Sequence, residues 1–342
     1  MPDSSNRTRT LLALCAAVPL FALAACGDDD TEAGSAGEGG DVELTLAHSY
    51  TDTQPQHRCG AQVIADEVEQ AGVGLRVEVF PSSQLGGDAD RISSVVSGDI
   101  DIDIQGASAL GAIYEPVSVL DAAYAIDDAD HLARYFESEA SDDLIESFAE
   151  ETGVRTLGAW SAGMRHFTAN EPIRTPDDLD GLRMRFPASP QFLMNAKALG
   201  AQAVEIAYEE LFLALQQGTA DGQENPIVNI AANSIQEVQD YLSLSSHQAN
   251  SNLVIIGGVW DELSAEQQEA LQAAVDSAVA QVPGCVDEDE QTTLTDWQDA
   301  GAIEVVDDVD VEAFRTRADT YLRENFNDEQ LAVYEGIRST AE

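Results

Sequence analysis

Apolar and polar positions alternate, and then recur at helical spacing, several times between residues 42 and 104. Alternating or β-branched segments predict short strands, whereas apolar residues spaced three and four apart predict helices. The predicted strands are residues 42–48, 75–80 and 99–104, and the predicted helices are residues 55–71 and 88–97. Strands that take turns with helices are typical of an α/β fold with a parallel sheet, and they argue against a β-sandwich.

The same kind of pattern continues through the rest of the chain. Ser264 and Gln267 form a capping box that predicts the start of a long helix, which Pro283 is expected to bend. The predicted strands are residues 164–169, 182–186, 241–245, 252–257 and 303–306, and the predicted helices are residues 208–217, 231–239, 264–281 and 311–323. At roughly 100–200 residues per domain, the length of the chain predicts two domains.

The chain is strongly acidic. Its 63 Asp and Glu residues outnumber 16 Lys and Arg residues, which gives a formal net charge of −47. Such a chain repels phosphate backbones and anionic membrane surfaces, so it argues against nucleic acid as a partner. A single lysine among so many acids suits concentrated salt, although a compositional bias of the source genome predicts the same surface.

The beginning of the chain has the pattern of an export signal followed by a linker. Two arginines precede an apolar run over residues 11–25, which is too short to span a bilayer as a helix. Small residues then lead into Cys26, an order that resembles a bacterial lipobox, in which the cysteine is lipidated. We expect residues 1–25 to be a lipoprotein signal peptide, with an ordinary signal peptide as the alternative. Residues 26–41, rich in Gly and acidic side chains, predict a flexible tether outside the membrane.

Two cysteines remain in the predicted mature body, Cys59 and Cys285. An oxidising exterior favours disulfides, so these two are candidates for a pair. Two buried free thiols are equally compatible with the sequence, because the sequence does not show whether the two side chains meet in space.

Two arginines lie in predicted strands next to residues that are typical of turns. Arg165 follows Gly-Met, and Arg185 lies in a short apolar strand that ends at a proline. A guanidinium offers a planar fork of N–H donors that matches a carboxylate, and Asn225 could add an amide donor. Alternation places Arg183 on the same face as Arg185, so we expect only one of these two to enter a cleft.

Three segments of the chain stand out together. They read Gly-Met-Arg-His-Phe-Thr-Ala-Asn, then Thr-Pro-Asp-Asp-Leu-Asp-Gly-Leu-Arg-Met-Arg-Phe-Pro, and later Asp-Gly-Gln-Glu-Asn-Pro. In these segments the chain resembles the solute-binding proteins of TRAP transporters, the C4-dicarboxylate-binding family. The resemblance implies that Arg185 clamps a carboxylate, that Arg165 also contacts the ligand, and that Asn225 faces it. It further implies a receptor outside the cytoplasm that passes a small organic acid to a permease with a small and a large integral-membrane subunit.

The resemblance also implies an architecture. It is a two-domain fold like that of periplasmic binding proteins, with a hinged ligand cleft and a long helix that spans both domains. We expect the first domain to comprise residues 42–162 and 251–290, and the second to comprise residues 163–250 and 291–342.

Further cleft residues follow from the resemblance with less specificity. The family places cleft-lining side chains at the positions of His48, Gln105 and Tyr208. Phe186 and Trp160 could pack on an apolar part of the ligand, although aromatic side chains more often belong to the core.

Sequence motifs for catalysis are absent from the chain. It has no Gly-x-Ser-x-Gly elbow, His-Glu-x-x-His pair, phosphate loop or Cys-x-x-Cys, so we expect no catalytic residues and no cofactor. Asp99, Asp101 and Asp103 alternate along one strand face rather than surrounding an ion, which argues against a metal site. The alternatives left open are the binding lipoprotein of an ABC transporter or sensor system, an extracytoplasmic enzyme, and a surface lipoprotein without a ligand.

Overall fold

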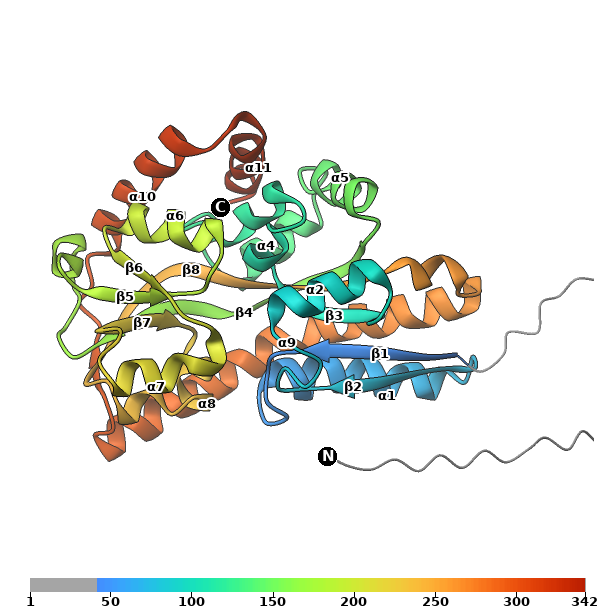
Figure 1. Cartoon of the computed structure of the whole chain (residues 1–342), viewed down its shortest axis with the longest axis horizontal. Helices are drawn as coiled ribbons and strands as arrows, with labels where there is room; N and C mark the ends of the chain where they lie inside the picture. Colours follow the sequence, from blue (N-terminus) through green and yellow to red (C-terminus); the bar gives the residue numbers. More distant parts are fainter. Residues whose placement is uncertain (1–41, 342) are drawn as a thin grey trace, which may run out of the picture. The chain divides into compact units, whose positions relative to one another are not determined.

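The computed structural model describes residues 42–341, which form a mixed α/β sheet with helices packed around it (Figure 1). The predicted signal peptide, the tether and Cys26 lie outside the described residues. Within the described part, the strands join in the order β2-β1-β3-β8-β4-β7-β5-β6, with β9 paired to β8. The strands are β1 (Val42–His48), β2 (Leu75–Phe80), β3 (Ile102–Gly106), β4 (Arg155–Ala169), β5 (Arg183–Phe186), β6 (Gln202–Glu205), β7 (Gly222–Asn225), β8 (Tyr241–Ile256) and β9 (Glu304–Val306).

Helices cover both faces of the sheet, and several short helical turns connect them. The α-helices are α1 (Gln62–Ala71), α2 (Asp88–Ser97), α3 (Ala107–Leu110), α4 (Ala129–Phe136), α5 (Asp142–Thr152), α6 (Pro190–Leu199), α7 (Leu211–Gln216), α8 (Ile227–Ala232), α9 (Ala265–Ala300), α10 (Val311–Asn325) and α11 (Asp328–Ser339). The short turns are η1 (Gln56–Ala61), η2 (Glu115–Asp121), η3 (Pro176–Leu179), η4 (Tyr208–Glu210), η5 (Ile235–Glu237) and η6 (Gly258–Glu262). None of the helices in residues 42–341 combines the length and the apolar character that a membrane span needs.

Two groups of parallel strands lie at opposite ends of the sheet. β1 pairs in parallel with β2 and β3, and β5 pairs in parallel with β6 and β7 (Figure 1). We call β1–β3 with their helices the first lobe and β5–β7 with theirs the second lobe. The long strands β4 and β8 run antiparallel between the lobes; β8 also pairs with β3 and β4 with β7. The two-domain α/β fold is confirmed, and the parallel pairing predicted for residues 42–104 is present in β1–β3. The pairs that β4 and β8 form with each other and with β3 and β7 are antiparallel, so the whole sheet is mixed.

The ladder between β4 and β8 is interrupted where the chain passes from one lobe to the other. The register shifts between Ser161 and Met164. Gly163 lies in this break with a φ of 99°, a left-handed backbone that favours glycine. The predicted domain boundary between residues 162 and 163 falls at the same place, and it remains a prediction.

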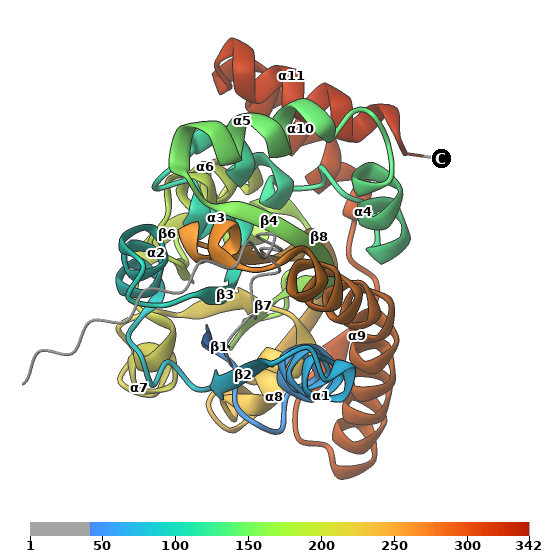
Figure 2. The same ribbon diagram turned by 90° about the vertical axis from the view of Figure 1, so that its right-hand side faces the viewer.

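The helix α9 runs along both lobes, as Figure 2 shows where it passes α1. It has 36 residues and begins at the predicted capping box of Ser264 and Gln267. The prediction that it ends near residue 281 is wrong, because the helix continues through Pro283 to Ala300. It contacts α1 and β4, and in its later part α8. This helix therefore provides the expected domain-spanning element.

A disulfide fastens α9 to the first lobe. Cys285 in α9 is bonded to Cys59 in η1, with an S–S distance of 2.09 Å and a Cα–Cα distance of 6.6 Å. Gly60 allows the ring of Trp160 to pack closely on this turn, since an added Cβ would lie 3.3 Å from the indole. The two cysteines that the sequence left open therefore meet in this structure.

Two local predictions fail at polar segments. The predicted helix over residues 231–239 is wrong, because α8 ends at Ala232 and Ser234 adopts a left-handed φ of 52°. The predicted strands 241–245 and 252–257 are two parts of the single strand β8. In both cases tertiary contacts determine the conformation of a polar segment, and the local pattern of apolar and polar residues does not encode these contacts.

Candidate functional site

A cavity of about 380 Å³ is lined by residues of both lobes and of β4 and β8. This volume lies toward the small end of the roughly 300–1,000 Å³ that ligand pockets occupy. Five of the eight predicted ligand-binding residues line it: Arg165, Arg185, Asn225, Gln105 and Tyr208.

Arg185 reaches the cavity from β5 and is only 2% exposed. Its Nε donates to the backbone oxygen of Ile206 at 2.9 Å, which fixes the direction of the guanidinium. Its Nη1 is buried and has no hydrogen-bond partner among the described residues. Burial lowers the pKa of Arg185 to about 10, with repulsion from Arg165 adding to the effect. Arg185 is therefore still a cation at neutral pH, and it lines the cavity with one N–H group, Nη1, that has no partner among the described residues.

Arg165, in contrast, is already paired. Its Nε and Nη2 form a two-pronged ion pair with Glu224, and the distance from Nη2 to Oε1 is 2.8 Å. Its Nη1 donates to Oδ1 of Asn250 at 2.6 Å, and the guanidinium lies over the ring of Phe192, 4.9 Å from the centroid. The charge of Arg165 is thus largely neutralised, which makes Arg185 the stronger anion site of the two.

Glu224 holds Arg165 from behind the cavity wall. Burial favours the neutral acid, but Arg165 and His247 outweigh it, so the pKa of Glu224 lies below its ordinary value. His247 Nε2 is 3.4 Å from Glu224 Oε2, and the imidazole stacks on Phe167 with 4.2 Å between ring centroids. Glu224 is therefore an ionised partner of Arg165 and not a free carboxylate in the cavity.

Asn225 and Tyr208 are held in place by their neighbours. The amide nitrogen of Asn225 donates to Gln223 at 2.6 Å, and its oxygen accepts from Arg165 at 3.1 Å. The Tyr208 hydroxyl accepts a hydrogen bond of 2.6 Å from Asn233, and burial raises the pKa of Tyr208 to about 12. Both side chains thus present fixed polar groups to the cavity in neutral form.

A buried ion pair supports the first-lobe side of the cavity. Arg91 donates to Asp103 and to Asp88, each at 3.0 Å, and its side chain and that of Asp103 have no solvent exposure. Gln105 in turn donates to Asp103 at 3.1 Å. One guanidinium therefore orients two side chains of the cavity wall, Asp88 directly and Gln105 through Asp103.

Three of the predicted residues lie outside the cavity wall. His48 is fully buried, and its Nε2 is 3.1 Å from Nδ1 of His57. Phe186 follows Arg185 in β5, so alternation turns it to the opposite face, where it joins the core. Trp160 packs in the other large core cluster, below η1 and α9. The expectation that these three line the cleft is therefore corrected.

Several lining residues were not predicted from the sequence. Tyr50 and Asp88 come from loops or helix starts of the first lobe, Phe192 comes from α6, and Asn250 and Asn252 come from β8. Asn250 and Asn252 are two apart, so they share one face of the strand. This alternation could have indicated that both asparagines line a cavity, but residues 246–251 resemble a polar loop.

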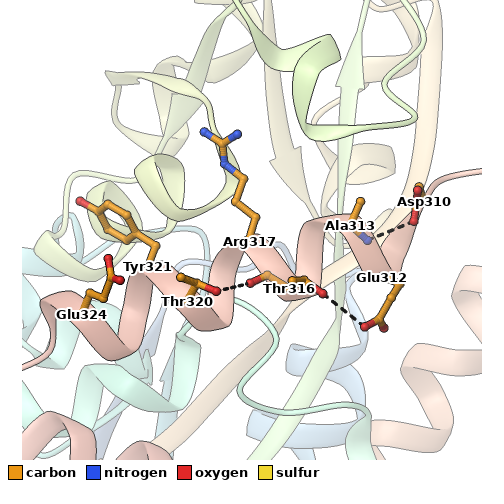
Figure 3. A pocket seen from close by; sticks show the side chains of 8 residues that line it. All are labelled: Asp310, Glu312, Ala313, Thr316, Arg317, Thr320, Tyr321 and Glu324. Carbon is orange, nitrogen blue, oxygen red and sulfur yellow. Dashed lines mark hydrogen bonds between the residues drawn. The ribbon is translucent and has the colours of Figure 1, made fainter.

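A second hollow, of about 630 Å³, lies along α10 (Figure 3). Polar groups there bond within the helix itself: Ala313 N donates to Asp310, and Thr320 donates to the backbone oxygen of Thr316. Arg317 also lines this hollow, and its guanidinium lies close to Gly200, where an added Cβ would be 2.9 Å away. The hollow has no buried polar group without a partner, so the cavity between the lobes is the better candidate site.

Comparisons with known proteins agree with this geometry. Residues 46–329 match the family described as bacterial extracellular solute-binding protein, family 7. The 2,3-diketo-L-gulonate-binding periplasmic protein of Escherichia coli is 31% identical over 83% of this chain and 86% of its own length.

Solved structures of TRAP periplasmic solute-binding proteins are also similar. The Polaromonas protein bound to D-erythronate has a TM-score of 0.81 at 29% identity, covering 88% of this chain and 99% of that one. The Shewanella oneidensis protein with bound succinate has a TM-score of 0.82 at 26% identity, covering 89% and 100%. The matched family model spans most of the chain, so this protein belongs to the bacterial extracellular solute-binding proteins of family 7, the solute-binding proteins of TRAP transporters.

Proposed function

We propose that this protein binds a small organic acid outside the cytoplasm, with Arg185 holding a carboxylate of the ligand. The observation that carries the proposal is the buried guanidinium of Arg185, which belongs to the cavity wall and whose Nη1 has no hydrogen-bond partner among the described residues. The relatives named above bind carboxylates according to their names, which supports the same ligand class. No catalytic role is proposed for the site.

A ligand carboxylate would remove the cost of an unpaired buried cation. The free site holds Arg185 at a lowered pKa because burial and Arg165 both disfavour its charge. A charge-assisted hydrogen bond contributes about 1.5–3 kcal/mol net. Because 1.4 kcal/mol corresponds to about ten-fold in affinity, a two-pronged contact accounts for a hundred-fold or more.

The proposal is tested with variants of Arg185 and a matched control. We expect Arg185→Ala to weaken carboxylate binding at least ten-fold, and Arg185→Lys nearly as much, since an ammonium does not reproduce the planar fork. Arg183→Ala removes an arginine of the same strand that is bound to Asp221 at 2.6 Å on the surface, so its affinity stays near wild type. Isothermal titration calorimetry with acids first selected by thermal shift measures all four proteins. Wild-type affinity in both Arg185 variants would remove Arg185 from the site.

We further propose that the protein delivers its ligand to a TRAP permease with one small and one large membrane subunit. Membership of the family supports this partner. Uptake of radiolabelled ligand into vesicles that contain the two subunits should require the wild-type protein and be lost with Arg185→Ala. Uptake that is the same without any binding protein would contradict the proposed delivery.

Lipid anchoring at Cys26 is part of the same proposal. The apolar run before Cys26 and the small residues next to it support it. Cys26→Ser should release the protein from the membrane fraction, and mass spectrometry of the wild type should find a lipid-modified N-terminal cysteine. An unmodified mature N-terminus at another residue would favour an ordinary signal peptide.

A further inference from the structure

The cavity wall is asymmetric in charge. Among the described residues, its cationic side chains are Arg165 and Arg185, and Glu224 neutralises the first. Acidic side chains also belong to the wall: Asp88, Asp90, Asp121 and Glu209. Among the described residues, the ion pair of Asp88 is with Arg91, and the charge of Asp88 also favours the charged form of Arg185. The site thus offers a single unpaired guanidinium, and the remaining charge of the wall is negative.

Asp88 is the acidic residue best placed to meet a ligand. It belongs to the first turn of α2, and its side chain is 50% exposed at the cavity. Its Oδ1 accepts from Ser49 at 2.8 Å and from Arg91 at 3.0 Å, which leaves Oδ2 without a hydrogen bond to the described residues. Arg91 does not cancel this charge completely, because it also donates to the buried carboxylate of Asp103. Asp88 therefore offers a fixed, negatively charged acceptor.

Neutral hydrogen-bond donors line the same cavity. Asn252 accepts from the Tyr50 hydroxyl at 2.8 Å, and Asn250 accepts from Arg165 at 2.6 Å. With their oxygens engaged, each carboxamide can turn its Nδ2 hydrogens toward a ligand. A hydroxyl group both donates and accepts, so it satisfies Asp88 and an asparagine amide at once. A carboxylate has no hydrogen to donate, and it would meet Asp88 as a like charge.

We propose that the ligand is a monocarboxylate with an uncharged, polyhydroxylated tail, a sugar acid of the aldonate class, and that Asp88 disfavours a second carboxylate. This inference rests on the proposed binding of an acid at Arg185 and specifies which acids the site accepts. Asp88 acts as a specificity-determining residue: it accepts from tail hydroxyls and repels a tail anion. Like charges a few ångströms apart interact strongly at the partly desolvated wall of a cavity, so the discrimination is large.

Two matched pairs of acids test this. D-Erythronate and meso-tartrate differ only in oxidation of the terminal carbon, as do D-galactonate and galactarate. Calorimetry with the purified mature protein should give at least ten-fold tighter binding of the aldonate than of the dicarboxylate in at least one pair. Asp88→Asn should reduce that ratio at least three-fold, mainly by improving dicarboxylate binding. Asp296→Asn, an exposed position on α9, controls for the overall charge and should leave the ratio unchanged.

The outcomes separate this inference from the proposed function. If acids bind and Arg185→Ala abolishes binding, but the dicarboxylates bind as tightly as the aldonates, the aldonate inference fails and the proposed function stands. Binding of other carboxylates but of neither pair, or tighter binding of glycine betaine, a carboxylate with a cationic tail, would also overturn the inference. An unchanged ratio in Asp88→Asn would remove Asp88 from its role. If no acid binds at all, the proposed function fails together with the inference.

Discussion

Glu290 allows a test of whether a carboxyl group of α9 is neutral in the folded protein. It lies in α9, and its carboxyl accepts from the backbone N–H of Ile227 at 3.2 Å, two residues after Asn225. The side chain also approaches Gly163, where an added Cβ would lie 2.6 Å from Oε1. Burial raises the pKa of Glu290 from its ordinary 4.5 to about 8, and Asp287 adds to this. We therefore expect Glu290→Gln to change the pH dependence of folding.

The sign of the effect follows from linkage. Below pH 4.5 the carboxyl is protonated in both the folded and the unfolded chain, so it contributes no pH-dependent cost. Between pH 4.5 and about 8 the unfolded chain releases this proton and the folded one keeps it, so the stability of the folded state falls as pH rises. At about 1.36 kcal/mol per pH unit, the whole interval corresponds to at most about 5 kcal/mol. Contact with solvent reduces that figure, and we expect about 1–3 kcal/mol.

Urea unfolding followed by circular dichroism measures the difference. At pH 9 the free energy of unfolding of Glu290→Gln should exceed that of the wild type by about 1–3 kcal/mol, because glutamine can still accept from Ile227 without becoming charged. At pH 4 the two proteins should be nearly equal. Glu288→Gln, an exposed neighbour on the same helix, should show no such pH dependence. An equal difference between Glu290→Gln and wild type at both pH values would refute the assignment of a buried neutral carboxyl.

Two further predictions concern the frame that connects the lobes. Gly163→Ala places a Cβ against Glu290 and Pro226 at a left-handed φ. It should lower the free energy of unfolding by about 1 kcal/mol more than Gly181→Ala, where the φ is also left-handed but nothing lies within 4 Å of the added Cβ. Equal losses in the two variants would contradict this. Replacing Cys59 and Cys285 by serine removes a cross-link over 226 residues and should lower stability by several kcal/mol, up to about 5 on the chain-entropy estimate. An unchanged urea midpoint would show that the disulfide does not constrain the unfolded chain.

The strands and helices that the sequence predicts well are those with complete local signals. Residues 42–48, 75–80 and 88–97 have the predicted bounds. In the last two segments, glycine or proline stands directly before and after the alternating or helically spaced residues. The paths of β4 and β8 could not be predicted in the same way. Their pairing joins residues that are distant in sequence, from Arg155 with Ile256 to Ala169 with Tyr241, through a ladder with register shifts, which no local pattern encodes.

In the candidate site, too, local patterns indicate some of the residues, whereas others depend on the pairing of distant strands. The strand pattern predicted that either Arg183 or Arg185 enters a cleft, and only the family resemblance selected Arg185. Alternation alone could have turned Phe186 away from the cavity. The pairing of Arg165 with Glu224 was not predictable, since it joins strands 59 residues apart in sequence. Asn250 and Asn252 were hidden because the polar side chains that line the cavity interrupt the apolar pattern of β8.

The pairing of Arg165 explains how so acidic a protein can present an anion site. A net charge of −47 opposes the approach of an anion, but screening confines the field of surface carboxylates to about 8–10 Å at ordinary ionic strength. Within the cavity, Glu224 takes up the charge of Arg165, which reduces the repulsion that Arg185 would otherwise meet from a second cation. Arg185 can therefore remain buried and charged while its Nη1 has no partner among the described residues. Glu224 thus favours anion binding indirectly, because by neutralising Arg165 it lets the guanidinium of Arg185 stay unpaired in the cavity wall.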